Sequence, residues 1–184
     1  MHFIETERLI LRPSREDEFE ETYRILVDEI EGEEFTREAY RPELQFSRSL
    51  AQQGLGEYFW RPSVYLKESQ RYIGNCLLMP RLCTPEERTV ARLTSTTEAH
   101  HSSIEAEIGW AISKLYRNEG YATEAARALI SYGFHTLQLP QILAFTWRGN
   151  PASMRVMEKL GMRLCPYTKT EDVVGVIEND SKIL

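Results

Sequence analysis

The chain has 184 residues, of which 42% are hydrophobic and 27% are charged, so it is long enough to bury the core of one globular domain. Its formal net charge is −6, which argues against a protein that binds nucleic-acid phosphates over a wide surface. A local basic pocket for one phosphorylated small molecule is compatible with this charge, and so is an amine substrate.

Cysteine use and hydropathy exclude two further classes of protein. Cys76, Cys83 and Cys165 are an odd number of thiols at wide spacings, so we expect reduced cysteines in a cytoplasmic protein and no disulfide framework. No apolar run approaches the roughly 20 residues that a membrane span needs. The N-terminus lacks the apolar centre of a signal peptide. We therefore expect no membrane partner.

The first sixty residues predict one strand and two helical segments. Residues 3–11 alternate hydrophobic and polar side chains, which is typical of a strand. Apolar residues recur with helical spacing over residues 19–30. Ser14 and Asp17 resemble a capping box before that helix, with Asp in place of the preferred Glu or Gln. We expect a second helical segment over residues 36–53, interrupted at Pro42, which closes near two glycines.

The middle of the chain predicts a β-hairpin, an open segment and a further strand. Residues 63–80 contain two strand-like runs around a polar turn. Residues 81–103 are polar, and two alternatives stay open for them: an extension of the hairpin strands or a mobile loop. Residues 104–112 alternate again, with apolar side chains on one face and Glu105 and Glu107 on the other, which predicts a strand.

The C-terminal part predicts alternating helices and strands. Residues 121–136 carry a stripe of small and apolar side chains that favours a helix packed on a sheet. A short buried strand over residues 141–147 follows, and then a helix that an asparagine and a proline open and a glycine closes. Residues 172–179 form a last strand. The order predicts one mixed α/β domain over residues 1–184.

The helix at residue 121 opens without a capping side chain. Its uncapped N–H groups and helix dipole would make an anion site, and Gly120 would let a phosphate approach the backbone. Taken alone, the turn is weak evidence for such a site, because a plain helix start has the same pattern. The glycine spacings of an NTPase phosphate loop and of a dinucleotide fingerprint are both missing from the chain.

Two motifs and their spacing resemble those of a known family. An R-x-x-G-x-A turn opens a helix directly after the strand at residues 104–112, and the sequence NPAS opens a second helix that ends in MEKLGM. This segment, residues 104–162, resembles the GNAT superfamily of N-acetyltransferases. The opening ETERLILRP is similar to the start of one branch, the ribosomal-protein alanine N-acetyltransferases (RimJ/RimL-like). The resemblance implies a mostly antiparallel twisted sheet, splayed after its fourth strand and flanked by helices.

The resemblance also implies acetyl-CoA as the acetyl-donor co-substrate. The backbone amides of residues 117–122 would cradle its pyrophosphate, and Arg117 would add a charge-assisted contact. The strand at residues 109–112 would splay from its neighbour and pair with the pantetheine amides. Gly109 would form a bulge there, or alternatively serve only packing, and the Ala111 N–H would face the thioester carbonyl. The implied cofactor contacts are Gly109, Trp110, Ala111, Ile112, Arg117, Asn118, Glu119, Gly120, Tyr121, Ala122, Thr123, Asn150 and Ser153.

The implied reaction needs a base, because an amine attacks a thioester only when it is neutral. A peptide α-amine with a pKa of about 8 is partly neutral at pH 7, whereas a lysine near 10.4 is almost wholly charged. Glu107 is the first candidate base and Glu105 the second, with two solvated strand glutamates as the alternative. Many superfamily members offer the departing thiolate a tyrosine where this chain has Met157. The RimJ/RimL-like branch resembles this chain in offering a serine, Ser153, as a hydrogen-bond donor.

The acceptor and one competing function stay open. We expect an N-acetyltransferase that acts on a primary amine, either a protein N-terminal α-amine or a small amine. The alternative is a non-catalytic acyl-CoA-binding module, which the lack of that tyrosine supports. Either protein would be a monomer or a homodimer without a nucleic-acid partner. His100 and His101 are discounted as metal ligands, because neighbouring residues on a strand point to opposite faces, so we expect no metal.

Overall fold

The computed structural model describes residues 3–29, 61–91, 102–167 and 170–179, together with residues 41, 42, 45 and 49. The strands are β1 (Ile4–Glu5), β2 (Leu9–Pro13), β3 (Pro62–Leu66), β4 (Tyr72–Cys83), β5 (Ser103–Ile112), β6 (Gln141–Trp147), β7 (Arg163–Pro166) and β8 (Asp172–Glu178). The helices are α1 (Phe19–Glu29), α3 (Pro85–Ala91), α4 (Tyr121–His135) and α5 (Pro151–Leu160), with 3-10 turns at Glu16–Glu18 and Lys114–Tyr116.

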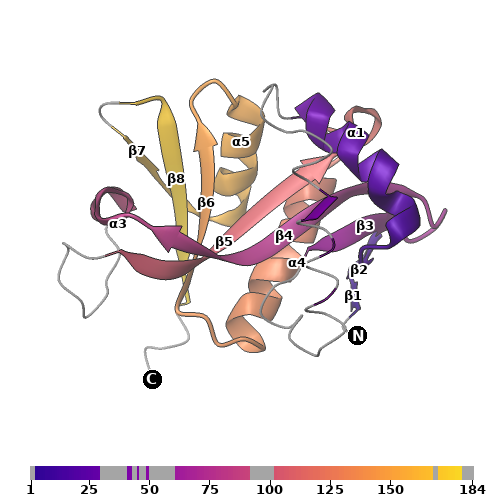
Figure 1. The fold of residues 1–184 in the computed structure, drawn as a ribbon, viewed down its shortest axis with the longest axis horizontal. Helices are drawn as coiled ribbons and strands as arrows, with labels where there is room; N and C mark the ends of the chain where they lie inside the picture. Colours follow the sequence, from indigo (N-terminus) through magenta and orange to yellow (C-terminus); the bar gives the residue numbers. More distant parts are fainter. Residues whose placement is uncertain are drawn as a thin grey trace.

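The eight strands form one sheet in the order β1-β2-β3-β4-β5-β6-β8-β7, with helices on both faces (Figure 1). Every neighbouring pair is antiparallel except β5 and β6, which are parallel. β5 is long and fully paired with β4, but its register with β6 contains the single pair Glu107↔Leu143. The two strands diverge after that pair, so the predicted splayed, mixed α/β sheet is confirmed.

The prediction of one strand over residues 3–11 is wrong, because the chain reverses between β1 and β2. The two strands pair antiparallel, with Ile4 opposite Leu11. Thr6 makes the reversal: its N–H donates to the Leu9 carbonyl at 3.0 Å, and its hydroxyl oxygen accepts from the Leu9 N–H at 2.9 Å. A turn closed by a threonine side chain lacks the glycine or proline that marks most reversals, so the alternating pattern runs through it.

The predicted capping box before α1 is also wrong. The Ser14 hydroxyl donates to the Arg61 carbonyl, and Asp17 forms an ion pair with Arg15. Glu18 accepts the Arg15 N–H instead, at 2.7 Å. The first turn is therefore a 3-10 turn held by Glu18, and the α-helix begins one residue later.

The hairpin is confirmed as β3 and β4. Part of residues 81–103, for which two alternatives were open, forms regular secondary structure. Residues 81–83 extend β4, and α3 follows two residues later. Residues 92–101 lie outside the described residues. Of the expected second helix, residues 41, 42, 45 and 49 are described and helical, and its other residues lie outside the described part.

The C-terminal order is confirmed, with one strand added. Residues 163–166 follow α5 directly and pair with β8 as β7, with Cys165 opposite Val174. Four residues that end in a proline give too short a pattern for period-two alternation to reveal. The strand closes the edge of the sheet beside β8.

The two faces of the sheet bury different cores. The larger core packs α4 and α5 on the sheet through residues such as Ile108, Leu129 and Met157. On the opposite face, α1 covers the end of β5 through Phe19 and Ala111, while α3 packs over β6 and β8. Among the described helices, none combines the length and the apolar character that a membrane crossing requires.

Candidate functional site

Helix α4 begins on bare backbone, as predicted. Its N-cap is Gly120, which has φ 83° and no side chain that could accept a hydrogen bond. Asn118, two residues earlier, also has a left-handed backbone with φ 65°. The first intrahelical bond runs from the Glu124 N–H to the Gly120 carbonyl at 3.0 Å. The N–H groups of the preceding helical residues are therefore not used by the helix itself.

A groove of about 430 Å³ lies where β5 and β6 separate, between the N-termini of α4 and α5. The N-terminus of α4 supplies one wall, and that of α5 supplies the other. Most of the expected cofactor contacts line it: Trp110, Ile112, Arg117, Asn118, Gly120, Tyr121, Ala122, Thr123, Asn150 and Ser153. Two segments that are about thirty residues apart in the sequence therefore meet at one site.

The charge of this groove is opposite to that of the whole chain. Arg117, Arg155 and Lys159 line it, and none of its lining residues within the described part of the chain is acidic. The chain as a whole carries a net charge of −6. Cations and uncapped helix N–H groups at the same place favour an anionic ligand.

Sequence reasoning missed Arg155 and Lys159. Both lie on α5 and line the groove together with Ala152 and Val156. Positions 152, 155, 156 and 159 follow the three- and four-residue spacing of one helix face. That spacing, applied to a helix already expected to border the site, is the signal that could have found them.

Arg117 turns its side chain back toward β5. Its Nε donates to the Ile112 carbonyl at 3.3 Å, and the side chain lines the groove. The guanidinium therefore joins the end of β5 to the turn before α4. Glu119 is exposed and does not line the groove, in keeping with a side chain directed at solvent.

Gly109 does not form the expected bulge. The register of β5 with β4 runs without interruption through the pair Leu77↔Gly109. A Cβ at Gly109 would meet the Leu77 side chain at 3.1 Å, so the glycine leaves room for that leucine. Ala111 packs with Phe19 on the face opposite the groove, and neither Gly109 nor Ala111 lines it.

Glu105 and Glu107 also lie outside the groove, on the face of β5 opposite Trp110 and Ile112. The Glu107 carboxylate accepts from Arg81 Nη1 at 3.2 Å. The Glu105 carboxylate accepts from the Gln141 amide at 2.7 Å and from the Ser103 hydroxyl at 2.6 Å. Both carboxylates are thus held by partners. They lie on one face of β5, and the groove lies on the other.

The start of α5 brings Asn150 and Ser153 together. Asn150 Oδ1 accepts the Ser153 N–H at 3.1 Å, which is the capping bond expected at this position. Ser153 lines the groove. Met157 is 0% exposed and belongs to the core against β8, where a Cβ at Gly175 would meet its sulfur at 3.0 Å. The position of the superfamily tyrosine is therefore a packing position in this chain.

Other reactive groups do not compete with the groove. All three cysteines are free and buried, and burial raises the pKa of the Cys76 thiol to about 12 and that of Cys83 to about 11. The thiols of Cys76 and Cys83 therefore stay protonated near neutral pH. The described residues contain no group of three His, Cys, Asp or Glu side chains that could hold a metal. His100 and His101 lie outside the described residues.

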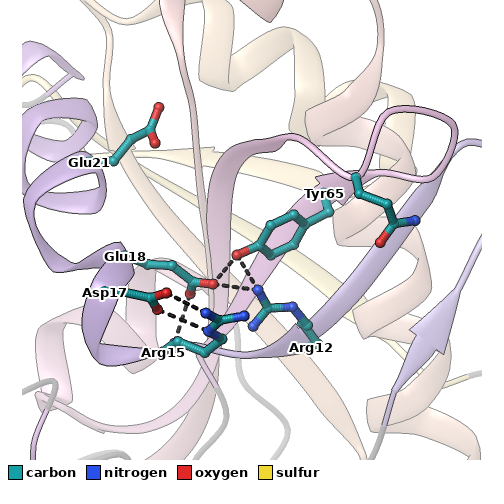
Figure 2. A pocket seen from close by; sticks show the side chains of 7 residues that line it. Arg12, Arg15, Asp17, Glu18, Glu21 and Tyr65 are labelled. Carbon is teal, nitrogen blue, oxygen red and sulfur yellow. Dashed lines mark hydrogen bonds and ion pairs between the residues drawn. The ribbon is translucent and has the colours of Figure 1, made fainter.

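A second polar pocket of about 340 Å³ lies at the start of α1 (Figure 2). It contains the buried Glu18 carboxylate, which contacts both the Arg12 guanidinium and the Tyr65 hydroxyl. Glu18 accepts from Arg12 Nη2 at 2.5 Å, from the Tyr65 hydroxyl, from the Ser63 hydroxyl at 2.7 Å and from the Arg15 N–H. These donors satisfy the carboxylate, so we interpret the cluster as the contact that holds the start of α1 against β2 and β3.

The chain is similar to known acetyltransferases. A family model described as an acetyltransferase (GNAT) domain matches residues 8–163. An uncharacterized N-acetyltransferase of Bacillus subtilis, YnaD, is 49% identical over 57 residues, which are 31% of this chain and 34% of the relative. The uncharacterized protein YkkB of the same organism is 34% identical over 111 residues, which are 59% and 53% of the two chains. The chain thus matches about a third to about half of the length of these relatives.

Solved structures share the fold over nearly the whole chain. An acetyltransferase from Agrobacterium tumefaciens has a TM-score of 0.70 at 23% identity, covering 97% of this chain and 95% of its own. RimL, a ribosomal L7/L12 alpha-N-protein acetyltransferase in complex with coenzyme A, has a TM-score of 0.69 at 14% identity, covering 98% and 100%. At these identities the similarity establishes the fold.

Proposed function

The chain belongs to the acetyltransferase (GNAT) family, and we propose that it transfers the acetyl group of acetyl-CoA to a primary amine. The observation that carries this proposal is the cationic groove at the split between β5 and β6. An acyl-CoA is a long ligand with an anionic pyrophosphate and an amide-bearing arm. A groove with uncapped N–H groups at one end and a diverging strand edge beside it suits both parts.

In this proposal the pyrophosphate binds the first turn of α4. The backbone N–H groups of residues 120–123 face it, and Arg155 and Lys159 add positive charge from the opposite wall. The pantetheine arm then runs along the free edge of β5 toward Trp110. Asn150 contributes both its cap of α5 and an amide that is exposed to the arm.

The reaction is a direct acyl transfer. The neutral amine nitrogen attacks the thioester carbon, the C–S bond breaks, and the amine proton passes to a base while CoA leaves as the thiolate. We propose Glu107 as that base, with Glu105 second, acting from the opposite face of β5 through the gap or through a water. Ser153 would donate a hydrogen bond to the thiolate. Arg81 holds the Glu107 carboxylate at 3.2 Å and would orient it.

We propose a protein N-terminal α-amine as the first acceptor to test and a small amine as the second. RimL, which shares the fold, is named for an alpha-N-protein substrate. An α-amine also has the larger neutral fraction at pH 7.

A second function is favoured by one observation. Met157 is buried where many superfamily members carry a tyrosine, so that proton donor is missing from this chain. A non-catalytic acyl-CoA-binding module would need no such donor. Binding would be common to both functions, and only the enzyme would turn over.

Two measurements separate these functions. Thermal unfolding with acetyl-CoA at a hundred times its Kd should stabilise the protein by about 2.7 kcal/mol, with ATP as the phosphate control. For a chain of this size that is a rise in Tm of roughly 5 to 10 °C. Thiol release with N-terminal peptides and small amines then tests turnover, with Glu107→Gln and Ser153→Ala as variants. Binding without turnover on any acceptor would favour the module, and no binding would overturn both functions.

A further inference from the structure

The N-terminal motif ETER lies against the outside of the turn that opens α4. The contacts join residues that are more than a hundred positions apart. Arg8 Nη1 donates to the Glu119 carbonyl at 3.0 Å, and Arg8 Nε donates to the Glu124 carboxylate at 2.7 Å. The Arg8 N–H and the Thr6 hydroxyl also donate to Glu124, at 2.9 and 2.6 Å. The Arg8 guanidinium lies 4.5 Å from the centre of the Tyr121 ring. We refer to Thr6, Arg8 and Glu124 as the clamp.

The clamp acts on a turn that needs support. Asn118 and Gly120 both have left-handed backbone, and such turns persist when their surroundings hold them. Arg8 bonds the carbonyl of Glu119, which lies between these two residues. In a trans peptide the C=O and the next N–H point in opposite directions. By holding the Glu119 carbonyl outward, Arg8 directs the Gly120 N–H away from itself, and Gly120 lines the groove.

The clamp also controls a charge. Glu124 lies in the first turn of α4, where a free carboxylate would repel an anion in the groove. It does not line the groove, and Arg8 forms an ion pair with it at 2.7 Å. Burial alone would raise the pKa of Glu124, but the hydrogen bonds from Thr6 and Arg8 outweigh burial and lower it. The carboxylate thus stays ionised, paired and turned to the outer side of the helix.

Arg8 does not line the groove either, so it does not reach a bound anion through that cavity. We propose that Thr6 and Arg8 are positioning residues for the acyl-CoA turn, which orient the Gly120 N–H and neutralise Glu124 from outside the site. This inference rests on the proposed function of the groove. It also gives the N-terminal motif a role in the same site as the R-x-x-G-x-A turn.

The test compares two acetyl donors. Acetyl-CoA has the pyrophosphate, whereas acetyl-pantetheine has the same thioester and arm without it. We expect Arg8→Ala to raise the KM for acetyl-CoA about tenfold or more. The Gly120 N–H would no longer be directed at the charged pyrophosphate, and this is the factor expected for the loss of one such hydrogen bond. The kcat should stay within about twofold, and kcat/KM for acetyl-pantetheine should be unchanged, because that donor has no group for the turn to bind.

A matched control and a second variant accompany Arg8→Ala. The Lys67 side chain is 42% exposed, as is that of Arg8, and it pairs with Glu5 at 2.8 Å in the same corner of the sheet. Lys67 touches Thr6 only through a 3.4 Å contact to its carbonyl, so Lys67→Ala should leave the KM for both donors unchanged. Arg8→Lys keeps the charge but cannot reproduce the planar fork, so we expect an intermediate KM.

Each outcome has one meaning. A wild-type protein that does not bind acetyl-CoA would remove the proposed function and this inference together. Wild-type binding with an unchanged KM in Arg8→Ala would overturn this inference alone. An equal loss with both donors would mean that Arg8 only supports the fold, and full activity of Arg8→Lys would mean that charge alone suffices. If Arg8→Ala does not fold, the same comparison is made with Arg8→Lys. A raised KM for acetyl-CoA alone would support the inference, and equal changes with both donors would overturn it.

Discussion

Arg8 and Arg12 lie four positions apart in the N-terminal stretch ETERLILRP, yet they build networks of different kinds. The Arg8 side chain is 42% exposed, and its partners Glu119 and Glu124 are 111 and 116 residues away in the sequence. The Arg12 side chain is 19% exposed, and its partners are Glu18, six residues on, and Tyr65, 53 residues on. The first network holds the turn before α4, and the second holds the start of α1 against the sheet.

The difference in burial decides what each network contributes. Water screens an exposed ion pair, so the Arg8 network stabilises the fold little, and its value lies in the direction it imposes on one peptide. The buried carboxylate of Glu18 accepts from Arg12 and from the hydroxyls of Ser63 and Tyr65, and removing it would leave two hydroxyls and a largely covered guanidinium without this acceptor. We therefore expect stability to depend on Arg12 and Glu18, and the proposed binding turn to depend on Arg8.

The largest expected effect is on stability, in Glu18→Ala. The substitution removes the carboxylate that accepts from Arg12, Ser63 and Tyr65, so the free energy of unfolding should fall by about 3 to 5 kcal/mol in urea titrations. Glu21→Ala is the control, because Glu21 lines the same pocket but stands apart from the cluster and is 54% exposed (Figure 2). It should change stability by no more than about 0.5 kcal/mol. Equal losses of unfolding free energy in the two variants would contradict the effect expected from the burial of Glu18.

Gly120→Ala should combine a moderate loss of stability with a loss of acetyl-CoA binding. The nearest atom to an added Cβ is Arg8 Nη2 at 3.5 Å, so the cost comes from the left-handed backbone and should be about 1 to 2 kcal/mol. Gly161→Ala is the control, since Gly161 has φ 81° and no atom within 4 Å of an added Cβ. Both variants should lose similar stability in urea titrations. Only Gly120→Ala should raise the KM for acetyl-CoA, and a matching rise in Gly161→Ala would contradict a specific role for the turn.

Arg8→Ala should cost at most about 1 kcal/mol of unfolding free energy, in spite of its expected effect on KM. Because the ion pair with Glu124 is partly exposed, added salt should reduce the difference from wild type. Urea titrations at low and high salt would measure this. A loss as large as that of Glu18→Ala would show that the two networks do not differ in the way their burial implies.

The smallest expected effect is a pH dependence. The pKa of Glu124 lies below its ordinary value of 4.5 because hydrogen bonds from Thr6 and Arg8 outweigh burial. Its contribution to stability is therefore present above that value and is lost as the pH falls through the folded pKa. The difference in unfolding free energy between wild type and Glu124→Gln, about 0.5 kcal/mol, should shrink between about pH 7 and about pH 3. A difference that grows as the pH falls would contradict a stabilising effect of the ionised Glu124 carboxylate.

Local patterns revealed most of the fold and the two helix starts that border the groove. The helix start at Gly120 and the cap at Asn150 depend on residues next to each other in the chain, so the sequence predicted both correctly. The reversal at Thr6 was missed because a side-chain hydroxyl closes it. The prediction of a bulge at Gly109 was wrong, because the glycine there leaves room for the Leu77 side chain on the neighbouring strand.

The sequence by itself determined the order of helices and strands, the uncapped turn and the family resemblance, because periodicity, capping and motif spacing act over a few neighbouring residues. Only the tertiary structure decided which side chains meet. It placed Ser153 in the groove and Glu107 across the strand from it, and it joined Arg8 to Glu124. Contacts between residues a hundred positions apart depend on how the sheet is assembled, and no local pattern encodes that assembly.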